Sequence, residues 1–261
     1  MGAIARDGVT LAYEESGDGD PPFVFVHGWT CNHTHFAPQL AHFSARHRVV
    51  AVDLRGHGRS DAPEEPYAIA TFADDVAWLC HELGVERPVV VGHSMGGAVV
   101  LELAARHPEL PRAIVMLDAA PVTKASEAAA IAAELSKNLR GPDAATIRAA
   151  LVDQTTATLA CEPSVQEAVR RDMLATADHV ALSCLEALGD WDGEAAARGC
   201  TVPALHIGAD DPINDAAALR ALNPLIRTGQ TVGAGHFNQL EAPDQVNAMI
   251  ERFLLVTAGA P

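Results

Sequence analysis

Short runs of apolar, mostly β-branched residues recur along the chain, and most of them stop just before a Gly or an Asp. They occupy residues 23–26, 49–52, 89–91, 113–117, 204–207 and 231–232. These runs are apolar throughout and do not alternate with polar residues, a pattern typical of strands buried on both faces of a parallel sheet. Residues 11–13 precede them and are expected to belong to an antiparallel edge strand.

Helical patterns lie between these runs. One apolar stripe has the spacing i, i+4, i+7 and i+11 of a helix that packs on a sheet, and its members are Phe72, Val76, Leu79 and Leu83. Val246, Ile250 and Phe253 form a second stripe behind Pro243, a residue type favoured in the first helical turn. Residues 95–105 are apolar nearly all round, which predicts a central, buried helix. The alternation predicts the α/β class, a mostly parallel central sheet with helices on both faces.

The segment between residues 121 and 200 breaks this alternation. It contains no strand-like run, and Ala-rich helical stretches occupy residues 124–140, 142–160, 163–177 and 178–188 instead. We therefore predict one α/β core formed by residues 1–121 and 201–261, with an inserted helical cap at residues 122–200.

The composition argues against several classes of partner. A formal net charge of −16 opposes binding to nucleic acid or to an anionic membrane, because phosphate contacts require Lys and Arg. The five cysteines are scattered without a CxxC pair, which indicates reduced thiols rather than a disulfide framework or a zinc site. No apolar h-region opens the sequence, and no stretch approaches the roughly 18 apolar residues of a membrane span. We expect a cytoplasmic protein.

A G-x-S-x-G pentapeptide at residues 92–96 lies between the run at 89–91 and the buried helix. Ser94 is expected at a sharp strand-to-helix turn, which the flanking glycines permit and which lifts the hydroxyl clear of the sheet. A helix N-terminus at that point favours developing negative charge. The pattern predicts Ser94 as a nucleophile, and the alternative is a Gly-rich turn with no catalytic role.

A serine nucleophile needs a base, and the chain has twelve histidines. His236 precedes the last helix and is expected to reach the carboxyl edge of the sheet, where ligands bind in open α/β sheets. His27, His57 and His93 adjoin Gly-rich turns and are expected to make structural hydrogen bonds. Four further histidines around the first helix are expected to face solvent and to bind no metal: His33, His35, His42 and His47.

The imidazole needs a carboxylate that fixes its tautomer. Asp118 follows the run at 113–117, and Asp210 and Asp211 follow the run at 204–207, so all three acids are candidates.

The oxyanion needs backbone donors as well. The N–H of Met95, directly after the nucleophile, is one expected donor. The other is the N–H of Trp29, in a loop where Gly28 is expected to let the backbone turn into the site.

With these motifs the chain resembles the α/β-hydrolase superfamily over nearly its whole length. The matching segments are V-x-V-H-G-W (24–29), D-L-R-G-H-G-R-S-D (53–61), G-H-S-M-G-G (92–97), G-A-D-D-P (208–212) and G-H-F-x-x-L-E-x-P (235–243). The resemblance implies a cap over the site and Ser94, Asp211 and His236 as nucleophile, acid and base. Asp211 has the family's spacing from Gly208, whereas some members draw the acid from the preceding strand, where Asp118 lies.

The resemblance further implies oxyanion donors at Trp29 and Met95, and loop-bracing roles for Asp53 and Arg55. Ser at the elbow excludes the haloalkane-dehalogenase and epoxide-hydrolase branches, which have Asp there. The H-G-W-T loop differs from the N-S-L-G loop of enol-lactone hydrolases and the HGGG loop of hormone-sensitive-lipase-like esterases. It is similar to the H-G-W-P loop of the arylesterase/perhydrolase group, with Thr30 in place of Pro.

These observations predict a serine esterase that cleaves a small or medium carboxylic ester through an acyl-enzyme, without cofactor or metal. The alternatives are a lactonase, thioesterase, C–C bond hydrolase or perhydrolase with the same triad, or a small-molecule receptor on this fold. The only aromatic residue between positions 121 and 200 is Trp191. The expected pocket lining is therefore largely aliphatic, which predicts a preference for short-to-medium aliphatic acyl groups. The residues expected to line the pocket are Gly28, Met173, Leu174, Leu182, Leu185 and Leu188.

Overall fold

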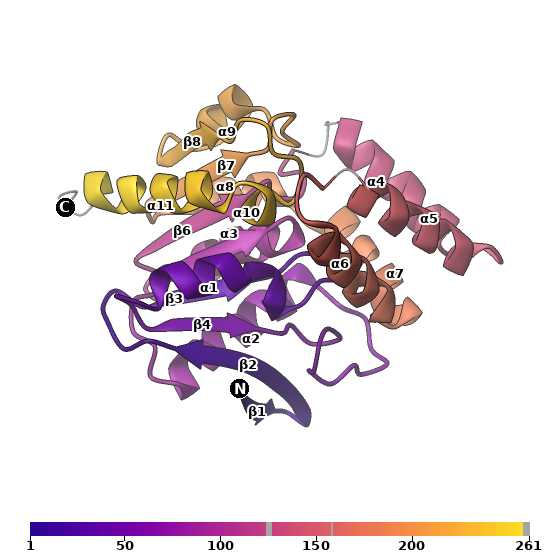
Figure 1. The fold of residues 1–261 in the computed structure, drawn as a ribbon, viewed down its shortest axis with the longest axis horizontal. Helices are drawn as coiled ribbons and strands as arrows, with labels where there is room; N and C mark the ends of the chain where they lie inside the picture. The colour runs from indigo at the N-terminus through magenta and orange to yellow at the C-terminus, as the bar shows by residue number, and fades with distance from the viewer. Residues whose placement is uncertain (124–126, 158, 258–261) are drawn as a thin grey trace.

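The computed structural model describes residues 1–123, 127–157 and 159–257. Within these residues an eight-stranded sheet has the order β1-β2-β4-β3-β5-β6-β7-β8 (Figure 1). β1 (Gly2–Arg6) and β2 (Val9–Ser16) form an antiparallel hairpin, and β2 also pairs antiparallel with β4. The remaining strands pair in parallel: β3 (Phe23–Val26), β4 (Val49–Val52), β5 (Val89–His93), β6 (Ala113–Leu117), β7 (Ala204–Gly208) and β8 (Ile226–Gln230).

The sheet confirms the predicted α/β class and differs from the prediction at both edges. The five longer apolar runs are strands, and β3 and β4 are buried at every position. β2 is antiparallel as expected, but the edge strand is β1, which the sequence reading missed. Asp7 and Gly8 form the turn between them with φ of 50° and 84°, as an Asp-Gly hairpin turn requires. That dipeptide is the signal that could have revealed β1.

The last strand is not where the sequence placed it. The sequence pattern predicts this strand at residues 231–232, but β8 ends at Gln230 and pairs with β7 from Ile226 onward. Only Ile226 of this strand is buried, because β8 lies at the edge of the sheet. An edge strand with one apolar residue lacks the continuous apolar pattern that identified the other parallel strands.

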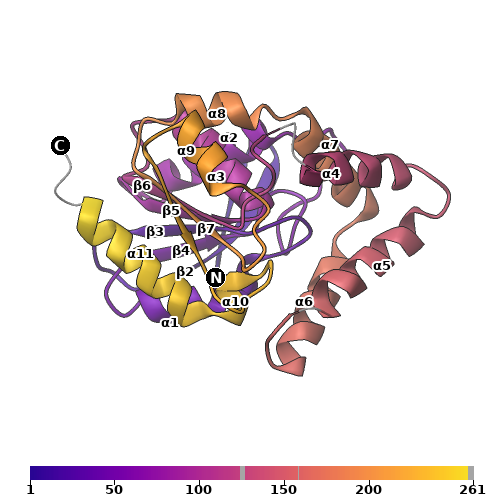
Figure 2. The same cartoon turned by 90° about the horizontal axis from the view of Figure 1, so that it is seen from above.

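Helices cover both faces of the sheet (Figure 2). Along each strand, successive side chains point to opposite faces. α1 (Ala37–Phe43) and α11 (Pro243–Thr257) bury Phe43 and Ile250 against Phe23 and Phe25. The other face carries α2 (Ile69–Glu82), α3 (Met95–Arg106), α8 (Gly193–Gly199) and α9 (Ala216–Leu222). Each fully buried large apolar side chain contributes about 1.5–3 kcal/mol, so the two clusters hold the sheet in a fixed position.

Four helices between β6 and β7 lie beyond the sheet edge, on the right of Figures 1 and 2. They are α4 (Glu127–Asn138), α5 (Ala144–Ala157), α6 (Pro163–Ala175) and α7 (Asp178–Asp190). Residues 124–126 and 158, which belong to the predicted helical stretches, lie outside the described residues. α8 also falls within the predicted cap segment, but it packs on α3 with the core. We use the word cap below for α4–α7 and their connections.

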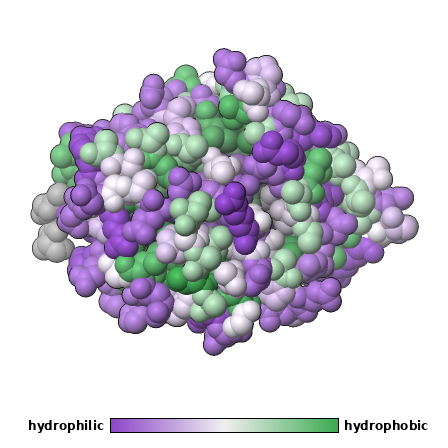
Figure 3. Space-filling model, turned by 60° about the horizontal axis from the view of Figure 1, so that its bottom comes forward, coloured by the Kyte–Doolittle hydropathy of each residue, from purple (hydrophilic) through white to green (hydrophobic). Residues whose placement is uncertain are grey.

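Polar residues cover much of the face shown in Figure 3, with smaller apolar patches between them. Among the described residues, no helix is long and apolar enough to cross a bilayer.

Candidate active site

The turn between β5 and α3 holds Ser94 in a strained backbone conformation, with φ of 54° and ψ of −116°. A Cβ at Gly92 would lie 2.1 Å from the carbonyl oxygen of Gly96, and a Cβ at Gly96 would lie 2.1 Å from that of Val26. Only glycine therefore fits on either side of the turn, as the sequence predicts. The Ser94 side chain stands at the carboxyl end of β5, at the N-terminus of α3.

The end of β6 anchors this turn. The Ser94 N–H donates to the carbonyl oxygen of Leu117 at 3.0 Å, and the Ala120 N–H donates to the carbonyl oxygen of Ser94 at 2.9 Å. Both backbone groups of Ser94 are thus paired with residues that flank Asp118. These two hydrogen bonds hold Asp118, the residue after β6, next to the Ser94 turn.

Asp118 is the carboxylate that contacts His236. Its Oδ2 lies 2.7 Å from His236 Nδ1, and its Oδ1 accepts the Ala209 and Ile213 N–H groups at 3.3 and 3.2 Å. The Asp118 side chain is 2% exposed, whereas that of His236 is 31% exposed. A buried carboxylate with three donors remains well solvated by protein dipoles, and it fixes the His236 proton on Nδ1.

This contact corrects the expectation that Asp211 backs His236. Asp211 is exposed, and within the described residues it has no hydrogen bond to the imidazole. The β7–α9 loop folds back over the strand end, so that a Cβ at Gly208 would lie 2.7 Å from the ring of Pro212. The backbone of this loop reaches Asp118, while Asp210 turns away and accepts the Gly233 N–H at 3.3 Å.

His93 supports the loop that carries His236. Its Nε2 lies 2.8 Å from the His236 carbonyl oxygen, which can only accept, so Nε2 carries the proton. The two imidazole rings lie 4.8 Å apart, and the His93 ring is equally close to Phe237. Burial, together with the neighbouring His236, lowers the pKa of His93 well below its ordinary value. A neutral His93 therefore adds no positive charge beside His236.

The other two histidines near Gly-rich turns also make structural hydrogen bonds, as predicted. His27 Nδ1 lies 2.8 Å from the Gly28 carbonyl oxygen, and its Nε2 accepts the Leu54 N–H at 3.0 Å. His57 Nδ1 lies 2.9 Å from the carbonyl oxygen of Arg55. Burial lowers the pKa of His27 to about 3 and that of His57 to about 4, so both imidazoles are neutral.

Glu241 is a supporting residue to which the sequence reading assigned no role. It ends α10 (Asn238–Glu241), and its carboxylate accepts the Gly235 N–H at 3.0 Å and the Phe237 N–H at 3.2 Å, on both sides of His236. The same carboxylate accepts the Ala160 N–H of the cap at 2.9 Å. The sequence feature that indicates this role is the Glu of the G-H-F-x-x-L-E-x-P segment, five residues after His236.

The two expected oxyanion donors have free N–H groups in the part of the chain that the structure describes. Neither the Trp29 nor the Met95 backbone N–H has a hydrogen-bond partner there. A Cβ at Gly28 would lie 3.1 Å from Ser94 Cβ, so the loop packs directly on the serine. The left-handed turn of this loop is at Thr30, with φ of 55°, and Gly28 serves the close approach.

The predicted pocket residues separate into two groups. Met173 and Leu174 of α6 lie in an apolar cluster with Trp29 and Phe237, the neighbour of His236. The three leucines of α7 differ in their surroundings: Leu185 is buried, Leu182 is half-buried, and Leu188 packs against the cluster of α2 and α3. Met173 and Leu174 thus share an apolar cluster with Phe237, the residue that follows His236.

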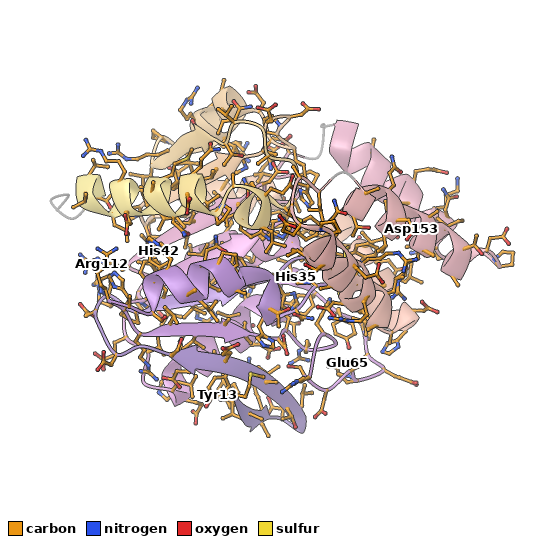
Figure 4. The ribbon with its side chains drawn as sticks, viewed as in Figure 1. Tyr13, His35, His42, Glu65, Arg112 and Asp153 are labelled. Atoms are coloured by element: carbon orange, nitrogen blue, oxygen red, sulfur yellow. The ribbon has the colours of Figure 1, made fainter. Side chains whose placement is uncertain are left out.

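Two histidines expected to face solvent are buried instead. His33 and His35 belong to η1 (His33–Phe36), which lies between the sheet edge and α6. His33 Nδ1 is 2.8 Å from Asp53 Oδ1, and His35 Nε2 is 3.6 Å from Asp172 Oδ2 of α6 (Figure 4 labels His35 at this junction). Burial alone would raise the pKa of Asp172, but its His35, Arg171 and Asn32 neighbours outweigh it and lower the pKa to about 2.

The predicted loop braces hold the segment after β4. Asp53 accepts the His33 and Arg59 N–H groups at 2.8 and 3.0 Å, and Arg55 donates two hydrogen bonds to Asp75. Neither side chain is among the groups around Ser94. Among the described residues, no group of three or more His, Cys, Asp or Glu side chains is arranged to hold a metal ion.

Comparison with known proteins identifies the family. A family model described as the alpha/beta hydrolase fold matches residues 21–243. The chain therefore belongs to the α/β-hydrolase fold family, a superfamily of hydrolases.

Individual relatives carry several hydrolase names. A 2-(acetamidomethylene)succinate hydrolase of Mesorhizobium japonicum is 41% identical over 113 residues, or 43% of this chain and 40% of that protein. This alignment, like that with a second 41% identical relative, spans less than half of the relative's length. A 3-oxoadipate enol-lactonase 2 of Acinetobacter baylyi is 28% identical over 95% of this chain and 94% of its own.

Solved structures agree on the fold. The enol-lactonase from Burkholderia xenovorans superposes with a TM-score of 0.84 and 27% identity, over 97% of this chain and 100% of that one.

Proposed function

We propose that this chain is a serine hydrolase that cleaves a small or medium carboxylic ester. Ser94 attacks the carbonyl carbon, and His236 takes the serine proton and delivers it to the leaving alcohol. The Trp29 and Met95 N–H groups bind the oxyanion. Each such donor commonly stabilises the transition state by about 3 kcal/mol. Water then attacks the acyl-enzyme with His236 as base, and the acid leaves. The reaction uses no cofactor or metal.

The observation that carries this proposal is the 2.7 Å contact between His236 Nδ1 and Asp118 beside the Ser94 turn. A buried acid that holds the Nδ1 proton leaves Nε2 free to accept a proton from a serine. Serine, imidazole and carboxylate then lie at one sheet edge in the chain order Ser, Asp, His, which G-x-S-x-G hydrolases use.

A fluorophosphonate probe tests the nucleophile. The wild type is expected to be labelled on Ser94 and to turn over a generic acyl ester many times per molecule. Ser94→Ala should fold with an unchanged melting temperature, lose labelling and lose nearly all turnover. Ser164→Ala, an exposed serine of α6, is the matched control and should retain both. Labelling elsewhere with an active Ser94→Ala variant would overturn the mechanism, and binding without repeated turnover would indicate a receptor.

A lactonase is the second candidate, because a full-length relative and a solved neighbour are both named enol-lactonases. The chemistry is the same, since a lactone is a cyclic ester whose leaving alcohol stays attached to the acyl group. A panel of open-chain esters, lactones and thioesters, compared by kcat/KM, separates these functions. A preference for lactones over matched open-chain esters of at least tenfold would favour the lactonase.

The loop at Trp29 argues against the H-G-W-P subgroup. Thr30 has φ of 55°, whereas the proline ring fixes φ near −65°. The H-G-W-T loop thus follows a backbone path that proline cannot adopt, which distinguishes it from the H-G-W-P loop. The acyl preference proposed for the aliphatic cap is short to medium, and a higher kcat/KM for polyaromatic acyl esters would contradict it.

A further inference from the structure

Two side-chain hydrogen bonds connect the cap to the loop that carries the proposed oxyanion donor. The Trp29 indole N–H donates to the Ala181 carbonyl oxygen of α7 at 2.7 Å. The Thr176 hydroxyl, between α6 and α7, donates to the Thr30 carbonyl oxygen at 3.2 Å. Both threonines are buried. The cap is therefore hydrogen-bonded to two neighbouring residues of this loop, Trp29 and Thr30.

Thr30 needs such support because its backbone is strained. A β-branched residue with φ of 55° is a genuine outlier, and such conformations persist only where their surroundings hold them. The Thr30 hydroxyl donates to the Trp29 carbonyl oxygen at 2.8 Å, and the Cys31 N–H donates to that of Gly28 at 3.2 Å. These local bonds lie inside the turn, whereas the Thr176 hydroxyl fixes the turn from outside.

Thr176 is itself held within the cap. The Arg148 guanidinium, on α5, is buried and donates to the carbonyl oxygens of Met173, Leu174 and Thr176 at 3.0, 2.8 and 2.6 Å. It also pairs with Asp178 at the start of α7. One cation thus joins three cap helices at the residue that contacts Thr30. The position of the Thr176 hydroxyl follows the position of the cap as a whole.

We infer that Thr176 is a positioning residue through which the cap holds Thr30 in its left-handed conformation and so aims the Trp29 N–H at the oxyanion. The inference rests on the proposed serine hydrolase. Loss of the hydroxyl lets Thr30 relax toward negative φ and turns the Thr30–Cys31 peptide, whose Cys31 N–H donates to the Gly28 carbonyl oxygen. The Gly28–Trp29 peptide, which carries the Trp29 N–H, loses this anchor and rotates. Such a rotation weakens a contact that exists only in the transition state, so kcat falls while ground-state binding is retained.

The test compares Thr176→Val, which removes the hydroxyl at nearly constant shape, with Thr176→Ser, which keeps it. We expect Thr176→Val to lower kcat and the rate of phosphonylation by the fluorophosphonate probe roughly tenfold, less than full loss of a donor. KM should change less than twofold, and Thr176→Ser should recover most of the rate. Thr156→Val is the matched control, because its hydroxyl bonds to Val152 within α5, and it should leave kcat unchanged.

A second background isolates the strain at Thr30. Thr30→Gly removes the Cβ that disfavours positive φ, so the Thr176→Val change should cost at most about threefold in this background. If Thr176→Val does not fold, Thr176→Ala removes the same hydroxyl donor to Thr30 with a smaller side chain. An equal loss in both backgrounds, or a loss in KM alone, would overturn the inference. Wild-type labelling away from Ser94 would instead overturn the proposed function itself.

Discussion

β6 and β7 are neighbours in the sheet, and the aspartates that follow the two strands lie in very different surroundings. Asp118, after β6, is buried with φ of 36°, and it holds His236 and two backbone N–H groups. Asp211, after β7, is exposed to solvent. The acid that pairs with His236 is therefore the one on which backbone N–H donors converge, Asp118, although the spacing from Gly208 favours Asp211.

The two strand ends also cooperate. The Ala209 and Ile213 N–H groups that stabilise Asp118 come from the loop that contains Asp211. The Asp118 N–H in turn donates to the Ile207 carbonyl oxygen of β7 at 2.8 Å. In this chain the loop after β7 supplies backbone donors to the acid of β6 and keeps its own carboxylates outside.

The largest expected effect separates the two aspartates. Asp118→Asn should keep the shape of the site but favour the wrong imidazole tautomer, lowering kcat by about 10⁴ as in the serine-protease triad. Asp211→Asn should stay within about twofold of the wild type, because the side chain faces solvent. Steady-state kinetics on one ester checks both variants. A crippled Asp211→Asn beside an active Asp118→Asn would reverse the comparison.

A smaller effect is expected at the loop that presents His236 to Asp118. Glu241→Gln keeps the size of the side chain but replaces one accepting oxygen with an amide that faces an N–H group. Hydrogen bonds to charged groups are worth about 1.5–3 kcal/mol, so we expect kcat to fall at least about tenfold.

The matched control for this prediction is Asp210→Asn, since an amide oxygen can still accept the Gly233 N–H. Its kcat should be close to that of the wild type. If Glu241→Gln is equally active, the contacts of Asp118 and His93 suffice to hold the His236 loop.

A third expected effect concerns the free energy of unfolding as a function of pH, and it involves a buried histidine of β7. His206 of β7 lies opposite Met116 of β6, and burial lowers its pKa to about 4, with Asp118 acting in the opposite direction. The unfolded chain therefore binds the proton first, near pH 6.5, and folding stability falls as pH drops from about 6.5 to 4. The expected slope for one such group is about 1.4 kcal/mol per pH unit.

Urea unfolding at several pH values between 7 and 4.5 measures this slope. His206→Gln should flatten this slope by about 1.4 kcal/mol per pH unit. The buried His27, His57 and His93 keep the remainder, because their pKa values are lowered as well. A slope that His206→Gln does not change would mean that the His206 pKa in the folded chain is close to its unfolded value.

Local patterns in the sequence were sufficient for the fold class and for two members of the candidate site. Apolar runs predicted the parallel strands because burial on both faces acts on each strand separately. The turn at Ser94 was predictable because the glycines that permit it are two residues away in the chain. His236 was predictable from a short motif before the last helix, and its Glu241 anchor stood in the same motif without being assigned.

Only the tertiary structure decided which acid meets His236, that His33 and His35 are buried, and that Thr176 contacts Thr30. Each of these facts depends on groups far apart in the chain: Asp118 and His236 are separated by 118 residues, and Thr30 and Thr176 by 146. All three candidate acids follow strands at the same carboxyl edge of the sheet, so the sequence by itself determined a set of candidates. The choice among them required the loop after β7 to fold back and direct its N–H groups at Asp118, because a buried carboxylate is stable only where such donors converge.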